Sequence, residues 1–432
     1  MGKNSRQRRD ARRRAVGRSA SPPPIGTDLR AVDREQIDAL IDLALILVPV
    51  ASALAPRVEQ LNMIGESAVG PSLDPAALVI DEVVARLGSA WEHGWQPLDL
   101  VHTARRQGSR RAASWMALAV LEEANRSRAR DRAPQAWVDQ IGSLSDRHGT
   151  GTGIESMLPP GGRATVEQWQ AALSALHLLR ILPASTLLMP PPSRWDAARS
   201  TSPHPAPAGV QGGEQKAKML TKVRSLLAKA ESTEFAAEAE AFTAKAQDLM
   251  TRYSIDAALV ADEAGESFDV GGVRVLIDQP YATEKASLLH VVAEANRVRA
   301  VWSQFMSCVT LVGVSADVEQ VDLLFTSTLV QATRSMTQAH LSSAGFRRAF
   351  LQAFAVRIGE RLAASSEETV ASYGSALVPV LARQEDAIER EVDRLFPNLT
   401  NGSRRRQFDA DGWHAGTRAA DAAVLPAGAV ES

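Results

Sequence analysis

The sequence is poor in cysteine and in long apolar runs, and each shortage argues against a class of protein. Its 1 cysteine, Cys308, cannot form an intrachain disulfide, which fits a reducing compartment. Apolar neighbours of Cys308 favour a small core residue over a reactive thiol. The best apolar stretch, residues 43–56, is too short to cross a bilayer. We therefore expect a buried helix there, no membrane partner and a cytoplasmic protein.

Net charge is also nearly absent. The 48 lysines and arginines almost balance the 50 acidic residues, which leaves a formal net charge of −2. The whole chain is therefore not a polycation. Any binding of nucleic acid must depend on local basic patches.

Catalytic motifs are missing too. The 8 histidines are scattered without metal-ligand spacing, and no cysteine pair accompanies them. The sequence contains no phosphate-binding Walker loop, no glycine-rich dinucleotide loop after a strand and no nucleophile elbow. We therefore predict no catalytic residue, no metal site and no cofactor.

Composition divides the chain into five parts. The start is strongly basic and continues into Ser and Pro rather than into an apolar run, which predicts a disordered arm and no secretory signal. Helical periodicity follows, and Pro-rich segments interrupt it because they cannot continue a helix. The predicted parts are a disordered basic arm (1–27), a helical N-terminal domain (28–182), a Pro/Gly-rich linker (183–213), a helical hairpin (214–260) and an α+β C-terminal domain (267–425).

The last part predicts a small sheet packed by helices. Three segments are rich in β-branched and aromatic residues, which favour strands: 268–278, 299–305 and 308–314. A Gly-Gly pair in the first of them indicates a bulge or turn. Helices alternate with these strands and follow them, so the predicted fold class is α+β, mainly helical, with a sheet of about three strands.

The stretch KVRSLLAKAESTEFAAEAEAF, which begins at Lys222, predicts two amphipathic helices around a short polar break. Such a hairpin is too small to fold alone, so we expect it to pack on the C-terminal domain. Lys218, Lys222 and Lys229 fall on one stripe beside the apolar face of the first helix. The stripe either contacts a phosphate backbone, pairs with Glu234, Glu238 and Glu240 of the second helix, or is simply solvated.

Two other groups of side chains are candidates for contacts. Arg347 and Arg348 flank a phenylalanine-rich helix and extend the possible nucleic-acid contact, although a solvated helix face is the plainer interpretation. Trp91 and Trp95 lie in the unusual segment WEHGWQPLDLVHTARR, where the intervening glycine predicts a turn before Pro97. They are candidates for a core, inter-domain or partner anchor, with a stacking platform for bases as the alternative.

The segment KVRSLLAKAESTEFAAEAEAFTAKAQDLMTRYSID resembles the signature of the domain-of-unknown-function 2786 family, which occurs in actinobacterial and phage proteins. Its two halves, K-[IV]-x-x-L-L-x-K-A and E-A-x-A-F-x-x-K-A-Q-x-L-M, run from Lys222 to Met250 around a small polar break. Other segments, including WEHGWQPLDLVHTARR, FRRAFLQAFAVRIGERL and GWHAGTRAADAA, also resemble actinobacterial members. The resemblance covers most of residues 30–425 and implies a shared architecture, but no activity.

Three functions remain open from the sequence. The first is a non-enzymatic, nucleic-acid-associated protein that uses the basic arm and the lysine stripe. The second is a protein–protein interaction or scaffold module that holds a partner through the hairpin, Trp91 and Trp95. The third is an enzyme with an unrecognised site, since the small sheet and its following helices resemble minimal zinc peptidases, although this sequence lacks their metal-binding helix motif.

Overall fold

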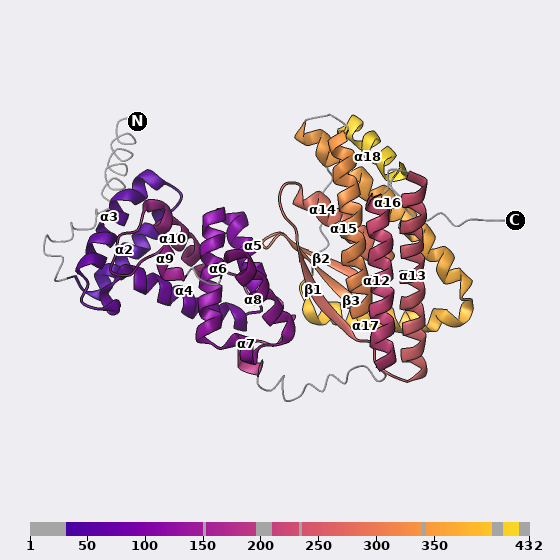
Figure 1. Ribbon diagram of the computed structural model, residues 1–432, viewed down its shortest axis with the longest axis horizontal. Coiled ribbons are helices and arrows are strands. Elements are labelled where there is room, and N and C mark those ends of the chain that lie inside the picture. Colours follow the sequence, from indigo (N-terminus) through magenta and orange to yellow (C-terminus); the bar gives the residue numbers. More distant parts are fainter. Residues whose placement is uncertain are drawn as a thin grey trace, which may run out of the picture.

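The computed structural model describes most of the chain, in the ranges 32–149, 153–195, 210–232, 236–338, 343–399 and 409–422. The predicted basic arm lies outside these ranges. The described residues are mainly helical and contain one three-stranded antiparallel sheet, which confirms the predicted α+β class (Figure 1). No helix in these ranges combines the length and apolar character needed to cross a membrane.

Helices α2 to α10 form the N-terminal half, drawn in indigo to magenta in Figure 1. Asp33, Asp74 and Thr165 cap α2, α4 and α10, because each side chain accepts a hydrogen bond from a backbone N–H in the first turn. The core of this half contains 6 of the 8 tryptophans. The helices are α2 (Arg34–Leu47), α3 (Ala51–Ser67), α4 (Pro75–Glu92), α5 (Pro97–Gln107), α6 (Arg110–Arg126), α7 (Ala129–Arg132), α8 (Gln135–His148), α9 (Ile154–Met157) and α10 (Val166–Arg180).

The apolar stretch at residues 43–56 is not the single buried helix that we predicted. Helix α2 ends at Leu47 and α3 begins at Ala51, because the ring of Pro49 cannot continue a helix. The turn leaves Ile46 76% exposed and Val50 53% exposed. An apolar run therefore need not be buried along its whole length.

The C-terminal half begins with the hairpin of α12 and α13, which stands in front of the other helices in Figure 1. The sheet and five further helices follow it in the described ranges, which also contain three short 3₁₀ turns. The elements are α12 (Val210–Ser232), α13 (Ala236–Glu263), β1 (Val270–Leu276), α14 (Ala282–Ala295), β2 (Arg299–Ser303), β3 (Cys308–Val314), α15 (Ser315–Gln338), α16 (Ala344–Ser372), α17 (Val378–Leu395) and α18 (Ala410–Ala422), and the 3₁₀ turns are Pro71–Leu73, Pro192–Arg194 and Ser375–Leu377.

Strand β3 is the centre of the sheet, in the order β1-β3-β2. Its side chains alternate between two faces. Val309 and Leu311 join the core formed with α14, α15 and α16. On the opposite face, Val312 packs with α17, whereas Cys308 joins the core of the N-terminal half. The sheet is therefore the layer on which the two halves of the chain meet.

The predicted bulge in the first strand is wrong. Strands β1 and β3 pair without interruption, with Gly271 opposite Gly313 and Gly272 opposite Val312. Gly272 instead permits a close approach, since a Cβ there would lie 2.8 Å from Cδ2 of Leu188. The Gly-Gly pair in the sequence therefore reflects close packing of Gly272 against Leu188 rather than a bulge in the strand.

Part of the predicted linker is packed rather than free. Ser185 donates its backbone N–H to the carbonyl of His93, and Thr186 donates its hydroxyl to the carbonyl of Leu395. The ring of Trp195 is fully buried and meets Trp137 edge-on, with ring centroids 5.5 Å apart. Helix α12 also begins four residues earlier than the predicted hairpin. The division into five parts stays a prediction.

Candidate functional site

The α12–α13 hairpin docks on the C-terminal half through its apolar faces. Val223 and Leu227 of α12 and Ala246 and Met250 of α13 are buried in the core shared with α14, α15 and α16. These positions follow the helical period that the sequence shows. The opposite face of α12 is left to the solvent.

That outer face carries the three lysines of the predicted stripe, which we call the α12 cationic face: Lys218, Lys222 and Lys229. All three side chains are exposed. The ammonium group of Lys229 lies 5.6 Å from the ring centroid of Phe242 on α13. The side chains of Glu234 and Glu238 lie outside the described residues, so the alternative pairing stays a prediction. Arg224, on the other flank of α12, pairs with Glu319 of α15 at 3.2 Å.

Arg347 and Arg348 lie in the first turn of α16, and the structure does not bring them to α12. Helix α12 packs on α13 and α15, whereas α16 packs mainly on α14 and α18. Arg348 is exposed and Arg347 is half-buried. Ser343 caps this helix by accepting a hydrogen bond from the backbone N–H of Phe346. The two arginines form a second, separate pair of cations.

Beneath the hairpin lies a buried polar network that the sequence did not reveal. Gln247 of α13 donates its amide to Thr251 and to Asn296, at 3.3 and 3.1 Å. About one turn beyond Thr251 on α13, Ser254 accepts a hydrogen bond from the guanidinium of Arg297 at 2.8 Å. The spacing of Gln247, Thr251 and Ser254 places them on one helix face, and a search for polar stripes would have found it.

Asp317 of α15 is the acidic member of this network. Its side chain is buried, and Gln384 of α17 donates to it at 3.1 Å. Burial raises the pKa of Asp317, although Arg297 and Ser254 favour the charged form. Three buried carboxamide atoms of the network have no hydrogen-bond partner in the described ranges: Gln247 Oε1, Gln320 Nε2 and Gln384 Oε1. The network ties α13 to α14, α15 and α17 and fixes the orientation of the hairpin.

Both candidate tryptophans are buried within the chain. The indole of Trp91 donates to Glu123 at 2.9 Å, and the indole of Trp95 donates to the carbonyl of Pro183 at 2.8 Å. Trp95 also meets Phe305 of the β2–β3 turn edge-on, with centroids 6.0 Å apart. Neither ring faces the solvent: Trp91 packs on Trp137 within the N-terminal half, and Trp95 packs on Phe305 where the two halves meet.

The turn between these tryptophans closes the junction of the two halves. Gly94 has φ +85°, and a Cβ there would overlap the backbone of Ser185. Arg274 of β1 reaches this turn and donates to Asp99 at 2.6 Å and to the carbonyl of Gly94 at 3.0 Å. The side chains of Arg274 and Asp99 are only 2% and 3% exposed. The segment WEHGWQPLDLVHTARR therefore supplies Gly94 and Asp99 to the contact between the two halves, and the anchor role predicted for its tryptophans stays a prediction.

Cys308 and His102 lie at the same junction but do not form a reactive pair. Burial raises the pKa of the Cys308 thiol to about 12, so it carries no thiolate at neutral pH. Burial also lowers the pKa of His102, which lies 3.7 Å from Asp278. Within the described ranges, no group of three or more His, Cys, Asp or Glu side chains could hold a metal ion.

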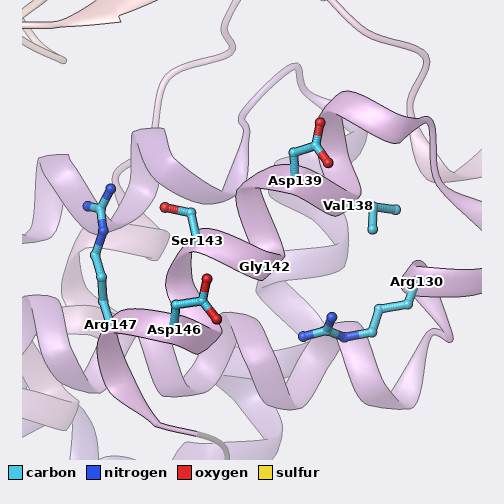
Figure 2. Close-up of a pocket in the computed structure, with 7 residues that line it drawn as sticks. All are labelled: Arg130, Val138, Asp139, Gly142, Ser143, Asp146 and Arg147. Carbon is cyan, nitrogen blue, oxygen red and sulfur yellow. The ribbon is translucent and has the colours of Figure 1, made fainter.

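A shallow pocket of about 540 Å³ lies along α8 (Figure 2). Asp139, Ser143 and Asp146 line it from α8, and Arg130 extends toward it from α7. Arg147 completes the charged lining, so the pocket carries two guanidinium groups and two carboxylates. This balanced charge, without a nucleophile beside a base, gives the pocket no evident chemistry.

Comparisons with known proteins agree with the resemblance of the hairpin. A family model described as a protein of unknown function, DUF2786, matches residues 218–257. This segment includes the α12 cationic face and the polar stripe of α13. Searches of curated proteins and of solved structures find no match.

Proposed function

We propose that the protein associates with nucleic acid through the α12 cationic face and has no catalytic role there. The observation that supports this is the exposure of Lys218, Lys222 and Lys229 on one side of a helix whose other side is packed. The 11 residue steps from Lys218 to Lys229 span about 16 Å of helix. Ammonium groups spread over that length match several phosphates of a backbone, whose charges recur every ~3.4 Å along a strand.

Other basic groups support the same proposal. Residues 1–27 contain eight lysines and arginines and one acidic residue. Arg347 and Arg348 add a further exposed or half-exposed pair of cations. Because the whole chain is close to neutral, these local groups rather than its net charge would attract a polyanion. A cytoplasmic location, which the single cysteine favours, belongs to this proposal.

The test is a charge reversal on α12. We expect Lys222→Glu/Lys229→Glu to weaken binding of a fluorescein-labelled DNA strand and of its duplex, measured by anisotropy at low salt. The slope of log K against log salt should also become shallower by about 1.4 for the single strand, because each phosphate that a lysine neutralises accounts for ~0.7 of that slope.

Helix α13 offers a matched control. Lys245 and Arg252 are exposed there, and both pair with Asp248, at 3.1 and 2.5 Å. Lys245→Glu/Arg252→Glu makes the same change in net charge and leaves α12 intact. Equal losses of affinity in the two variants would show that only net charge matters and would contradict a binding face on α12.

A further inference from the structure

The corner between α5 and α6 gathers four arginines, which we call the arginine corner: Arg105, Arg106, Arg110 and Arg111. Helix α5 ends at Gln107 and α6 begins at Arg110, with Ser109 capping α6 through Ala112. Arg106 is half-buried, and the other three side chains are exposed. The sequence from Leu100 to Leu121 contains no acidic residue.

These arginines differ from others in the same half of the chain. Arg126, Arg163 and Arg180 each bond two carboxylates. Among the residues that the structure describes, no member of the arginine corner has an ion pair. Two carboxylates act on this region: Arg111 helps to lower the pKa of Glu167 without an ion pair, and Asp278 lies 3.7 Å from His102. The corner is thus a local concentration of uncompensated positive charge.

A pocket of about 470 Å³ adjoins the corner. Arg106 and Gln107 line it from α5, and Gln304 and Phe305 line it from the β2–β3 turn. Arg106 and Gln107 both donate to the carbonyl of Phe305, which fixes the two sides of the pocket together. Trp95 supports the phenyl ring from the protein side. The lining therefore combines a guanidinium, two carboxamides and the ring of an aromatic residue.

We propose that this corner and pocket bind a single-stranded nucleic acid, with phosphates on the arginines and one unstacked base in the pocket. A phenyl ring offers a stacking surface, and carboxamides can hydrogen-bond base edges. A base within a duplex is already stacked and paired and cannot enter such a pocket. The proposal rests on the proposed function, which it extends to a second surface and to a preference for single strands.

The experiment compares three variants of the full chain with the parent protein, using a labelled mixed-sequence DNA strand and the same sequence as a duplex. Arg105→Ala/Arg110→Ala/Arg111→Ala should reduce the single-strand salt slope by about 2. Phe305→Leu and Gln304→Glu should each lower single-strand affinity by about fivefold or more and leave duplex affinity unchanged. Gln304 is exposed, so Gln304→Glu tests the pocket even if Phe305→Leu perturbs folding.

The pocket on α8 supplies the control. Arg130→Ala/Arg147→Ala removes two exposed arginines that lie beside Asp139 and Asp146, and it should leave binding unchanged. Unchanged affinities in the corner and pocket variants, together with weaker binding by Lys222→Glu/Lys229→Glu, would overturn this inference alone. Absence of binding by the parent protein would overturn both proposals. Two further results would contradict a single-strand site. One is that the pocket variants weaken duplex binding as much as single-strand binding. The other is that the parent protein binds phosphatidylserine vesicles more strongly than DNA.

Discussion

Arg274 shows how far the contact between the two halves depends on single side chains. Its guanidinium donates to Asp99, to Ser185 Oγ at 2.7 Å and to the carbonyl of Thr186 at 2.5 Å. The residue stands on β1, opposite Thr310 of β3. One buried side chain thus connects the sheet, the turn after α4 and the extended segment after α10.

Replacing Arg274 should destabilise the fold strongly. Arg274→Met leaves the buried Asp99 carboxylate without its cation, with only the backbone N–H of Gln96 still donating to it, and the free energy of unfolding should fall by about 3–5 kcal/mol in urea denaturation. The double variant Arg274→Met/Asp99→Leu removes both charges and should recover much of that stability. A decrease below about 1 kcal/mol in the single variant would show that the pair contributes little.

Glu123 should make stability depend on pH. Burial raises its pKa above the ordinary 4.5, although Trp91 donates a hydrogen bond to it. A raised carboxyl pKa stabilises the folded state most below pH 4.5, and the contribution disappears as pH rises through the folded pKa. The stability of the parent protein relative to Glu123→Gln should therefore fall between pH 4.5 and neutrality. A pH-independent difference in urea denaturation would contradict this.

Among the helices and strands, the sequence predicted those features that depend on a local pattern of residue types. β3 occupies the segment predicted for it, 308–314, because β-branched residues favour a strand and Ser315 begins the next helix. The hairpin and its exposed lysines follow from the helical period. The polar network beneath the hairpin did not emerge, because it joins α13 to side chains of α15, α17 and the end of α14 that only the folded chain brings together. The arginine corner is local in the sequence, but the pocket beside it depends on the β2–β3 turn, which only folding brings to α5.

Two adjacent glycines of β1 test the view that Gly272 permits close packing rather than a bulge. A Cβ at Gly272 would meet Leu188, whereas a Cβ at Gly271 would meet nothing within 4 Å. Gly272→Ala should lower the free energy of unfolding by about 1–3 kcal/mol. Gly271→Ala, in the same strand, should change it far less. If the two substitutions destabilised the protein equally in thermal denaturation, the loss would come from the backbone conformation of both glycines rather than from close packing at Gly272.

For the whole molecule, the distribution of charge matters more than its sum. Many described arginines are paired with carboxylates on this nearly neutral chain, whereas some surfaces carry several exposed cations close together in the sequence. The α12 cationic face and the arginine corner are two such places, on different halves of the chain. The sheet and the junction around Arg274 connect these halves. The two surfaces are therefore carried on one connected scaffold.

The most direct test of this account is the salt dependence of DNA binding by the full chain. Contacts from three lysines and three exposed corner arginines predict that single-strand affinity falls by about two to three orders of magnitude between about 50 and 200 mM salt. The measurement is the anisotropy of a fluorescein-labelled strand across that range. A linear decrease of log K with log salt would agree with the account. Affinity that does not change with salt, or no binding at the lowest salt, would contradict it.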